Sequence, residues 1–148
     1  MSIMKTVAIG NDHVAYEMKF FVKELLEGKG YTVLNFGCDD AAKVDYPSFA
    51  RSVATAIGNG EAGLGVLICG SGIGISIAAN RFPHIRAALV HDALGARLSR
   101  QHNDANVLCL GAQTLGRWVA RDCVDAFFST DFEPAIHAHR VRMLGEML

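Results

Sequence analysis

Residues 69–74, with the sequence CGSGIG, combine a thiol, a hydroxyl and three glycines in one short segment. The segment follows an apolar run at 66–68 that is typical of a buried strand, and it precedes apolar residues that predict a helix. Glycine lets a backbone approach a ligand closely, and a helix start leaves N–H groups free to bind negative charge. A thiol facing such donors is expected to be partly thiolate near neutral pH. The segment could therefore supply a base and an anion site, although a tight turn with an inert buried Cys69 is the competing interpretation.

Other reactive side chains follow predicted strands. Asp12 and His13 follow Asn11 after an apolar run at 5–10, and Asp45 and Tyr46 lie where a polar loop at 37–45, which follows a strand at 31–36, meets a helix. Loops that follow parallel strands converge at one edge of a sheet, so these residues and the Cys69 loop are expected to share a cleft. Each also has a purely structural alternative, namely helix capping for Asp12 and Asp45 and a surface position for His13.

A further polar string, residues 99–104, contains His102 and Asn103. It interrupts a helical pattern that begins at residue 91, and we expect it to form a loop near the same cleft. Together the four groups would offer a base, an acid, an anion site and carboxylates that bind hydroxyl groups.

Short apolar strands alternate with helical patterns along the whole chain. This order predicts a three-layer α/β/α, Rossmann-like fold with a five-stranded parallel sheet and an additional C-terminal helix. The expected strands are residues 5–10, 31–36, 66–68, 86–90 and 107–110, each apolar because each is buried. The expected helices end near residues 28–30, 58, 81, 100 and 128, and the last one covers about 132–147.

The composition is that of a globular protein. The 148 residues are 51% hydrophobic and 20% charged, and they predict one domain, 1–148, without a linker. A formal net charge of −1 provides no basic surface for nucleic acid or membrane binding. The four cysteines form no CxxC pair, and no secretion signal or membrane-spanning run is present, which predicts a cytoplasmic protein with reduced thiols.

Neither a metal nor a nicotinamide cofactor is predicted. The expected cleft loops contain no paired histidines, and His137 and His139 lie two apart in a predicted helix, so they face different directions. The glycine loop follows the third strand, whereas dinucleotide-binding folds place theirs after the first.

The motifs GNDHVAYEMK at 10–19, DYP at 45–47, ICGSGIGISIAAN at 68–80 and LSRQHNDANVL at 98–108 resemble the ribose-5-phosphate isomerase type B family, which includes galactose-6-phosphate isomerase subunits. The resemblance covers nearly the whole chain. It implies a metal-free aldose–ketose isomerase of phosphorylated sugars. It also implies a homodimer or a dimer of dimers, with each site at a subunit interface.

The resemblance also implies individual roles. Cys69 matches the base that moves a proton between C1 and C2, and Ile75 stands where another branch of the family has a glutamate base, which places the chain in the cysteine branch. His102 matches the acid that opens the sugar ring, and Asn103 matches a substrate contact from the partner subunit. The remaining matches bind the enediolate, the sugar or its phosphate: Ser71 with the backbone of Gly70, Gly72, Ile73 and Gly74, and Asp12 with His13.

Two phosphate-binding positions depart from the family pattern. Gln113 and Ile136 occupy positions that are commonly arginine, and of the expected cations only Arg140 remains. Nearby His137, His139 and Arg142 offer partial compensation, although Arg142 would face away from Arg140. The departures put the substrate in question more than the reaction.

The first hypothesis is an isomerase that interconverts D-ribose 5-phosphate and D-ribulose 5-phosphate through an enediolate. Alternatives within the enzyme class are a tetrose 4-phosphate, such as erythrose or erythrulose 4-phosphate, and a hexose 6-phosphate. A non-catalytic sugar-phosphate-binding subunit and a nucleotide- or flavin-binding module are the hypotheses from other classes. The presence of Cys69, Ser71 and His102 favours catalysis.

Overall fold

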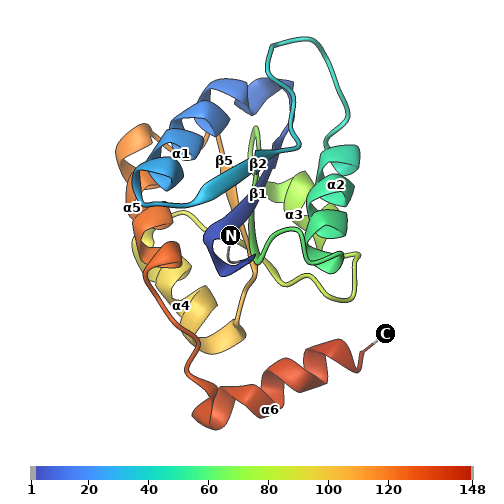
Figure 1. Cartoon of the computed structure of the whole chain (residues 1–148), viewed down its shortest axis with the longest axis vertical. Coiled ribbons are helices and arrows are strands. Elements are labelled where there is room, and N and C mark those ends of the chain that lie inside the picture. The colour runs from blue at the N-terminus through green and yellow to red at the C-terminus, as the bar shows by residue number, and fades with distance from the viewer. Residues whose placement is uncertain (1–2, 148) are drawn as a thin grey trace.

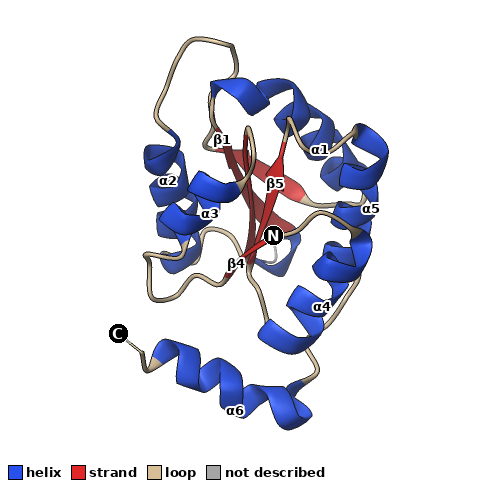
Figure 2. Cartoon of the chain, turned by 180° about the vertical axis from the view of Figure 1, so that it is seen from behind, coloured by secondary structure: helices blue, strands red, loops and turns tan. Residues whose placement is uncertain are grey.

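The computed structural model describes residues 3–147, which form a parallel five-stranded sheet covered by helices. The strand order is β2-β1-β3-β5-β4, and every neighbouring pair is parallel. Helices α1, α4 and α5 cover one face and α2 and α3 cover the other (Figures 1 and 2). The predicted three-layer fold with its five parallel strands is confirmed.

The elements follow one another with short connections. The strands are β1 (Thr6–Asn11), β2 (Thr32–Asn35), β3 (Leu64–Cys69), β4 (Ala87–Leu89) and β5 (Val107–Gly111). The helices are α1 (Tyr16–Gly28), α2 (Tyr46–Gly58), α3 (Ile73–Ala79), α4 (Ala93–Asn103), α5 (Arg117–Phe128) and α6 (Pro134–Gly145), with short 3₁₀ turns at Ile3–Lys5 and His13–Ala15.

Alternation of side chains along the central strands builds two separate cores. In β3, Val66 and Ile68 join the core under α1, α4 and α5, while Leu67 and Cys69 join the core under α2 and α3. Successive strand residues point to opposite faces, so a strand buried on both sides must be apolar throughout. This accounts for the continuous apolar runs in β1, β3 and β5.

The two edge strands differ from the prediction. β2 and β4 are only partly buried, because each has a neighbour on one side alone. Both are also shorter than the apolar patterns that predicted them. Their outer edges therefore do not need full burial, and their sequences tolerate polar residues such as Asn35.

Helix α4 is longer than predicted. The polar string at 99–104 does not break it, and the helix continues through His102 and Asn103 to end at Asp104, whose φ of 47° is left-handed. Aspartate is among the few residues that adopt this conformation readily. His102 and Asn103 therefore lie on a helix end and not in a loop.

Helix α6 lies apart from the sheet, beside α4, and contains no buried residue (Figure 2). Several large apolar side chains on and just after it are exposed, among them Ile136 at 68% and Met147 at 79%. Within residues 3–147, no helix has the length and apolar character needed to cross a membrane.

Candidate active site

The thiol of Cys69 lies beneath the glycine loop that connects β3 to α3. The residue is 5% exposed, and its Sγ accepts a hydrogen bond from the Gly72 N–H at 3.2 Å. The loop thus holds Cys69 at the carboxyl edge of the sheet with its sulfur turned toward backbone donors.

The loop is shaped by close packing at its glycines. Gly72 has a φ of +77°, and a Cβ there would lie 2.6 Å from Leu89 Cδ1. A Cβ at Gly74 would lie 2.6 Å from the Tyr46 ring, so this aromatic side chain rests directly on the loop. Glycine is therefore required at position 72 by backbone conformation and by space, and at position 74 by space.

Some loop donors are already engaged. The Ile73 N–H donates to Ser71 Oγ at 3.2 Å, just as Gly72 donates to Cys69. In the described part of the chain, the N–H groups of Gly70, Ser71, Gly74 and Ile75 have no hydrogen-bond partner. Ser71 and Gly74 are therefore among the donors that an oxyanion could use.

Several predicted site residues surround this loop. The Asp12 N–H donates to Ile68 O at 3.2 Å, and the Asp12 carboxylate accepts from Val14 N at 3.1 Å, so it caps the turn that presents His13. The Gln113 N–H donates to Gly70 O at 2.9 Å, which brings the loop after β5 against the glycine loop. We call this group of residues the loop cluster: Asp12, His13, Asp45, Tyr46, Cys69, Gly70, Ser71, Gly72, Ile73, Gly74 and Gln113.

His13 is held by the loop between β2 and α2. The Val44 N–H donates to His13 Nδ1 at 3.3 Å. Since Nδ1 then acts as an acceptor, the neutral ring carries its proton on Nε2, which is free to donate to a ligand oxygen. Asp45 is the N-cap residue of α2, as the capping alternative expected, but its side chain makes no capping hydrogen bond.

His102 and Asn103 do not join the loop cluster, and the expectation of one common cleft within the chain is wrong for them. They end α4 next to Arg86 and Ala87, where β4 begins. Cys69 pairs with Gly111 at the opposite end of β5, and the five residues of that strand span about 13 Å. Within one chain, the predicted base and the predicted ring-opening acid therefore lie at opposite edges of the sheet.

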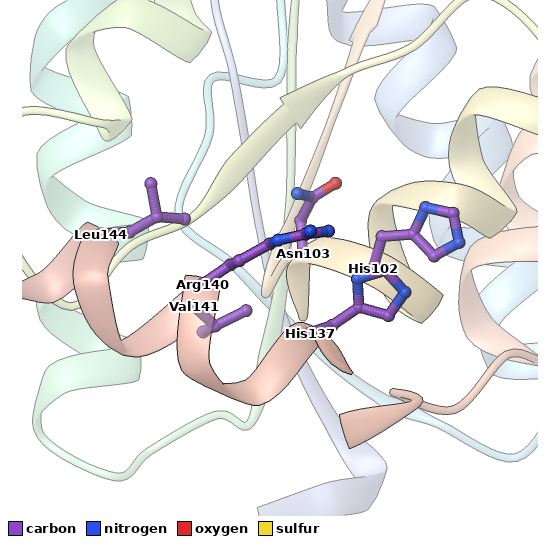
Figure 3. Close-up of a pocket in the computed structure, with 6 residues that line it drawn as sticks. All are labelled: His102, Asn103, His137, Arg140, Val141 and Leu144. Atoms are coloured by element: carbon purple, nitrogen blue, oxygen red, sulfur yellow. The ribbon is translucent and has the colours of Figure 1, made fainter. Parts of the chain in front are cut away.

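A concave site lies between α4 and α6. It has a volume of about 290 Å³, and Figure 3 shows Arg140 reaching from α6 toward Asn103 on α4. The rings of His102 and His137 stack with centroids 4.3 Å apart. We call this site the helical groove; its lining residues are His102, Asn103, His137, Arg140, Val141 and Leu144. Ile136 lies outside the lining, on exposed surface.

Comparison with known proteins is decisive for the family. The model of the ribose/galactose isomerase family matches residues 7–144. The chain belongs to this family. Its members among curated proteins include ribose-5-phosphate isomerase B of Escherichia coli, which is 42% identical over 141 residues and covers 95% of both chains. Galactose-6-phosphate isomerase subunit LacB of Clostridium acetobutylicum is 38% identical, over 86% of this chain and 74% of that protein.

Solved structures of ribose/galactose isomerases have the same fold. Ribose-5-phosphate isomerase B of Clostridium thermocellum superposes with a TM-score of 0.94 at 44% identity, over 96% of each chain. The type B enzyme of Trypanosoma brucei gives a TM-score of 0.94 at 39% identity, over 98% of this chain and 99% of that one. The family resemblance that the four motifs predicted is confirmed.

Sequence reasoning missed two buried residues that hold the loop at 37–45 in place. Asn11 and Lys19 are both fully buried, and both hydrogen-bond to the start of the loop at 37–45. A signal was present, because Lys19 occupies a position on the apolar face of α1 that also contains Ala15 and Val22. A charged residue on a core-facing stripe must find partners, which marks it for attention.

Proposed function

We propose that this protein interconverts D-ribose 5-phosphate and D-ribulose 5-phosphate. The observation that carries the proposal is the Cys69 thiol under the glycine loop, with the Gly72 N–H on its sulfur. The family of the chain and the names of its relatives support the same reaction. The chemistry requires a base beside donors that can stabilise an oxyanion, and the loop contains both.

In the open-chain aldose, the Cys69 thiolate removes the proton from C2. The electron pair of that C–H bond forms the C1=C2 bond of an enediolate, and negative charge develops on O1. The free N–H groups of Ser71 and Gly74 are the donors for this charge, each worth about 3 kcal/mol in comparable sites. Returning the proton to C1, with transfer of the hydroxyl proton from O2 to O1, completes the ketose.

A complete site requires two copies of the chain. His102 would protonate the ring oxygen of the furanose, yet it lies at the sheet edge opposite Cys69. In a homodimer, the helical groove of one subunit could lie over the loop cluster of the other. His102 of one subunit would then lie near Cys69 of its partner. Helix α6, which contains no buried residue, is the element that would pack on the second subunit.

Substrate contacts then divide between the two subunits. His13 Nε2–H, Asp12, Asp45 and Tyr46 would bind sugar hydroxyls from the loop cluster, with Gln113 beside them. Arg140 and His137 of the groove would bind the phosphate together with Asn103. Since Gln113 and Ile136 bring no charge, the phosphate would depend mainly on the groove of the second subunit.

The deciding experiment measures kcat/KM of the full-length protein with ribose 5-phosphate, erythrose 4-phosphate and hexose 6-phosphates. The proposal expects ribose 5-phosphate to be preferred by about tenfold or more, which corresponds to a difference of roughly 1.4 kcal/mol in transition-state binding. A preference for the tetrose or the hexose phosphate would contradict the proposed substrate but leave the proposed isomerase reaction in place. Binding of sugar phosphates without any turnover would indicate a non-catalytic subunit instead.

The four free thiols fit a reducing compartment, so we place the reaction in the cytoplasm.

A further inference from the structure

Lys19 is a fully buried lysine on helix α1. Its side chain has no exposed surface, and it is among the largest fully buried side chains in residues 3–147. Removing an ammonium group from water is costly unless hydrogen bonds and an opposite charge replace the lost hydration. The partners of Lys19 therefore indicate what its burial achieves.

All three donors of the ammonium group are used. Nζ donates to Asn35 Oδ1 at 3.2 Å, to Cys38 O at 2.8 Å and to Asp39 Oδ1 at 2.5 Å. An ammonium group has three N–H donors, so its hydrogen-bonding capacity is filled. The three acceptors lie at the end of β2 and at the start of the loop 37–45, which Lys19 thus holds against the body of the protein.

Asn11 and Gly37 fix the same point of the loop. The Asn11 Nδ2 group donates to Cys38 O at 3.0 Å, so this carbonyl accepts from both Asn11 and Lys19. A Cβ on Gly37 would lie only 1.8 Å from Asn11 Oδ1, so the loop can approach this closely only with glycine there. The start of the loop is therefore held against Asn11, the last residue of β1. Asn11 immediately precedes Asp12 in the chain.

The far end of the same loop reaches the loop cluster. Val44 N donates to His13 Nδ1 at 3.3 Å, and Tyr46 rests on Gly74. Between the two ends, residues 39–43 are exposed, with Ala42 N donating to the Asp40 carboxylate at 2.9 Å. The loop therefore reaches Val44 between two anchors: Lys19 and Asn11 hold its start, and α2, which begins at Tyr46, holds its end.

We propose that Lys19 is a positioning residue of the active site. By holding Cys38 and Asp39, it places the Val44 N–H on His13 and so keeps His13 in the form that donates from Nε2. The inference rests on the proposed function in one respect, namely that His13 binds the substrate. A purely structural role would affect stability alone and would leave the tautomer of His13 unchanged.

The test compares Lys19→Met with Lys23→Met. Lys23 lies one turn further along α1, is partly exposed and pairs with Glu27 of the same helix, so it is a matched control. Lys19→Met should lower kcat/KM by about 10- to 100-fold, a loss typical of small displacements of binding groups, with a large part of it in KM. Lys23→Met should stay within about twofold of the wild type, because an exposed ion pair within one helix contributes little.

A second readout does not depend on activity. The ¹⁵N chemical shifts of the His13 ring should show the Nε2–H tautomer in the wild type and in Lys23→Met, and a mixture of tautomers in Lys19→Met. Unchanged kinetics and an unchanged tautomer in a folded Lys19→Met would overturn the inference. A wild type without isomerase activity would reject the proposed function, while the tautomer comparison would still decide whether Lys19 orients His13.

Asp39→Ala provides an independent variant if Lys19→Met does not fold. The Asp39 side chain is 62% exposed, so its truncation leaves the core intact but removes one of the three ammonium acceptors. It should shift the His13 tautomer in the same direction and raise KM by a smaller factor. An unaltered His13 signal and KM in Asp39→Ala would contradict the proposal.

Discussion

His102 and His137 stack face to face, with ring centroids 4.3 Å apart and planes inclined by 21°. The stack joins the end of α4 to α6 and forms one wall of the helical groove. Because this groove lies where strands β4 and β5 begin, it faces away from Cys69, which ends β3. In the proposed function, a single chain thus provides two half-sites, one with Cys69 and one with His102.

Mixing two inactive variants should restore activity. Cys69→Ala removes the proposed base and His102→Asn removes the proposed acid, and in a mixed dimer of the proposed kind one of the two shared sites contains neither change. Random exchange of equal amounts should therefore recover about a quarter of wild-type activity, as expected for a two-fold symmetric pair. The measurement is kcat per chain after mixing under conditions that allow subunits to exchange. Absence of recovery despite exchange would place both residues of a working site in one chain.

Replacing Cys69 should remove turnover but preserve binding. Cys69→Ala deletes the proposed base, and general bases contribute about 10²- to 10⁴-fold to such reactions. Calorimetric titration with a sugar phosphate should still give a Kd near the KM of the wild type, since the groove and His13 are unchanged. A variant that retained more than about a tenth of kcat would exclude Cys69 as the base.

His102→Asn should discriminate between cyclic and open-chain sugars. Ribose 5-phosphate closes to a furanose, whereas a tetrose 4-phosphate has its ring-forming hydroxyl esterified and stays open. The variant should lose about 10²-fold or more in kcat with the pentose and much less with the tetrose, because an acid needed only for ring opening has no role with an open-chain sugar. Equal losses with both sugars would reject the ring-opening role.

Gly72→Ala should destabilise the fold, while Gly28→Ala should not. The added methyl group at Gly72 meets Leu89 Cδ1 at 2.6 Å and the Leu110 carbonyl carbon at 2.9 Å, and the backbone there is left-handed. Strain of this kind costs about 1–3 kcal/mol. A Cβ at Gly28 has no atom within 4 Å. Urea denaturation of both variants measures the difference, and equal midpoints would contradict the packing described for the glycine loop.

Asp39 should add a pH-dependent contribution to stability. Hydrogen bonds from Lys19 first and Asn35 second lower the pKa of its carboxyl group. The stabilisation is therefore present above the unfolded value of about 3.9 and disappears as the pH falls through the folded pKa. Asp39→Asn should cost about 1 kcal/mol or less at pH 7, because the carboxylate is largely exposed, and nothing once both states are protonated. Urea unfolding at pH 7 and near pH 3 compares the two proteins, and an equal difference at both pH values would contradict this linkage.

Local sequence patterns were sufficient for the sheet and most helices. Apolar runs such as residues 66–68 can only be buried on both faces, and a tight turn followed by apolar helix spacing predicts the strand–loop–helix unit around Cys69. The same patterns could not locate the end of α4, because Asp104 terminates that helix through a left-handed conformation that polar residues only sometimes adopt. Nor could they show that β2 and β4 are half-buried, since edge positions depend on strand order.

The sequence by itself determined the order of elements, the glycine loop with its thiol and the family, because these depend on residue type and short-range spacing. Only the tertiary structure decided that His102 and Cys69 lie at opposite ends of the strands, because a helix that follows β4 returns its last residues to the edge where the next strand begins. It likewise decided that Lys19 is buried and bound to a loop 20 residues away, since hydrogen bonds between distant segments leave no periodic signal in a chain.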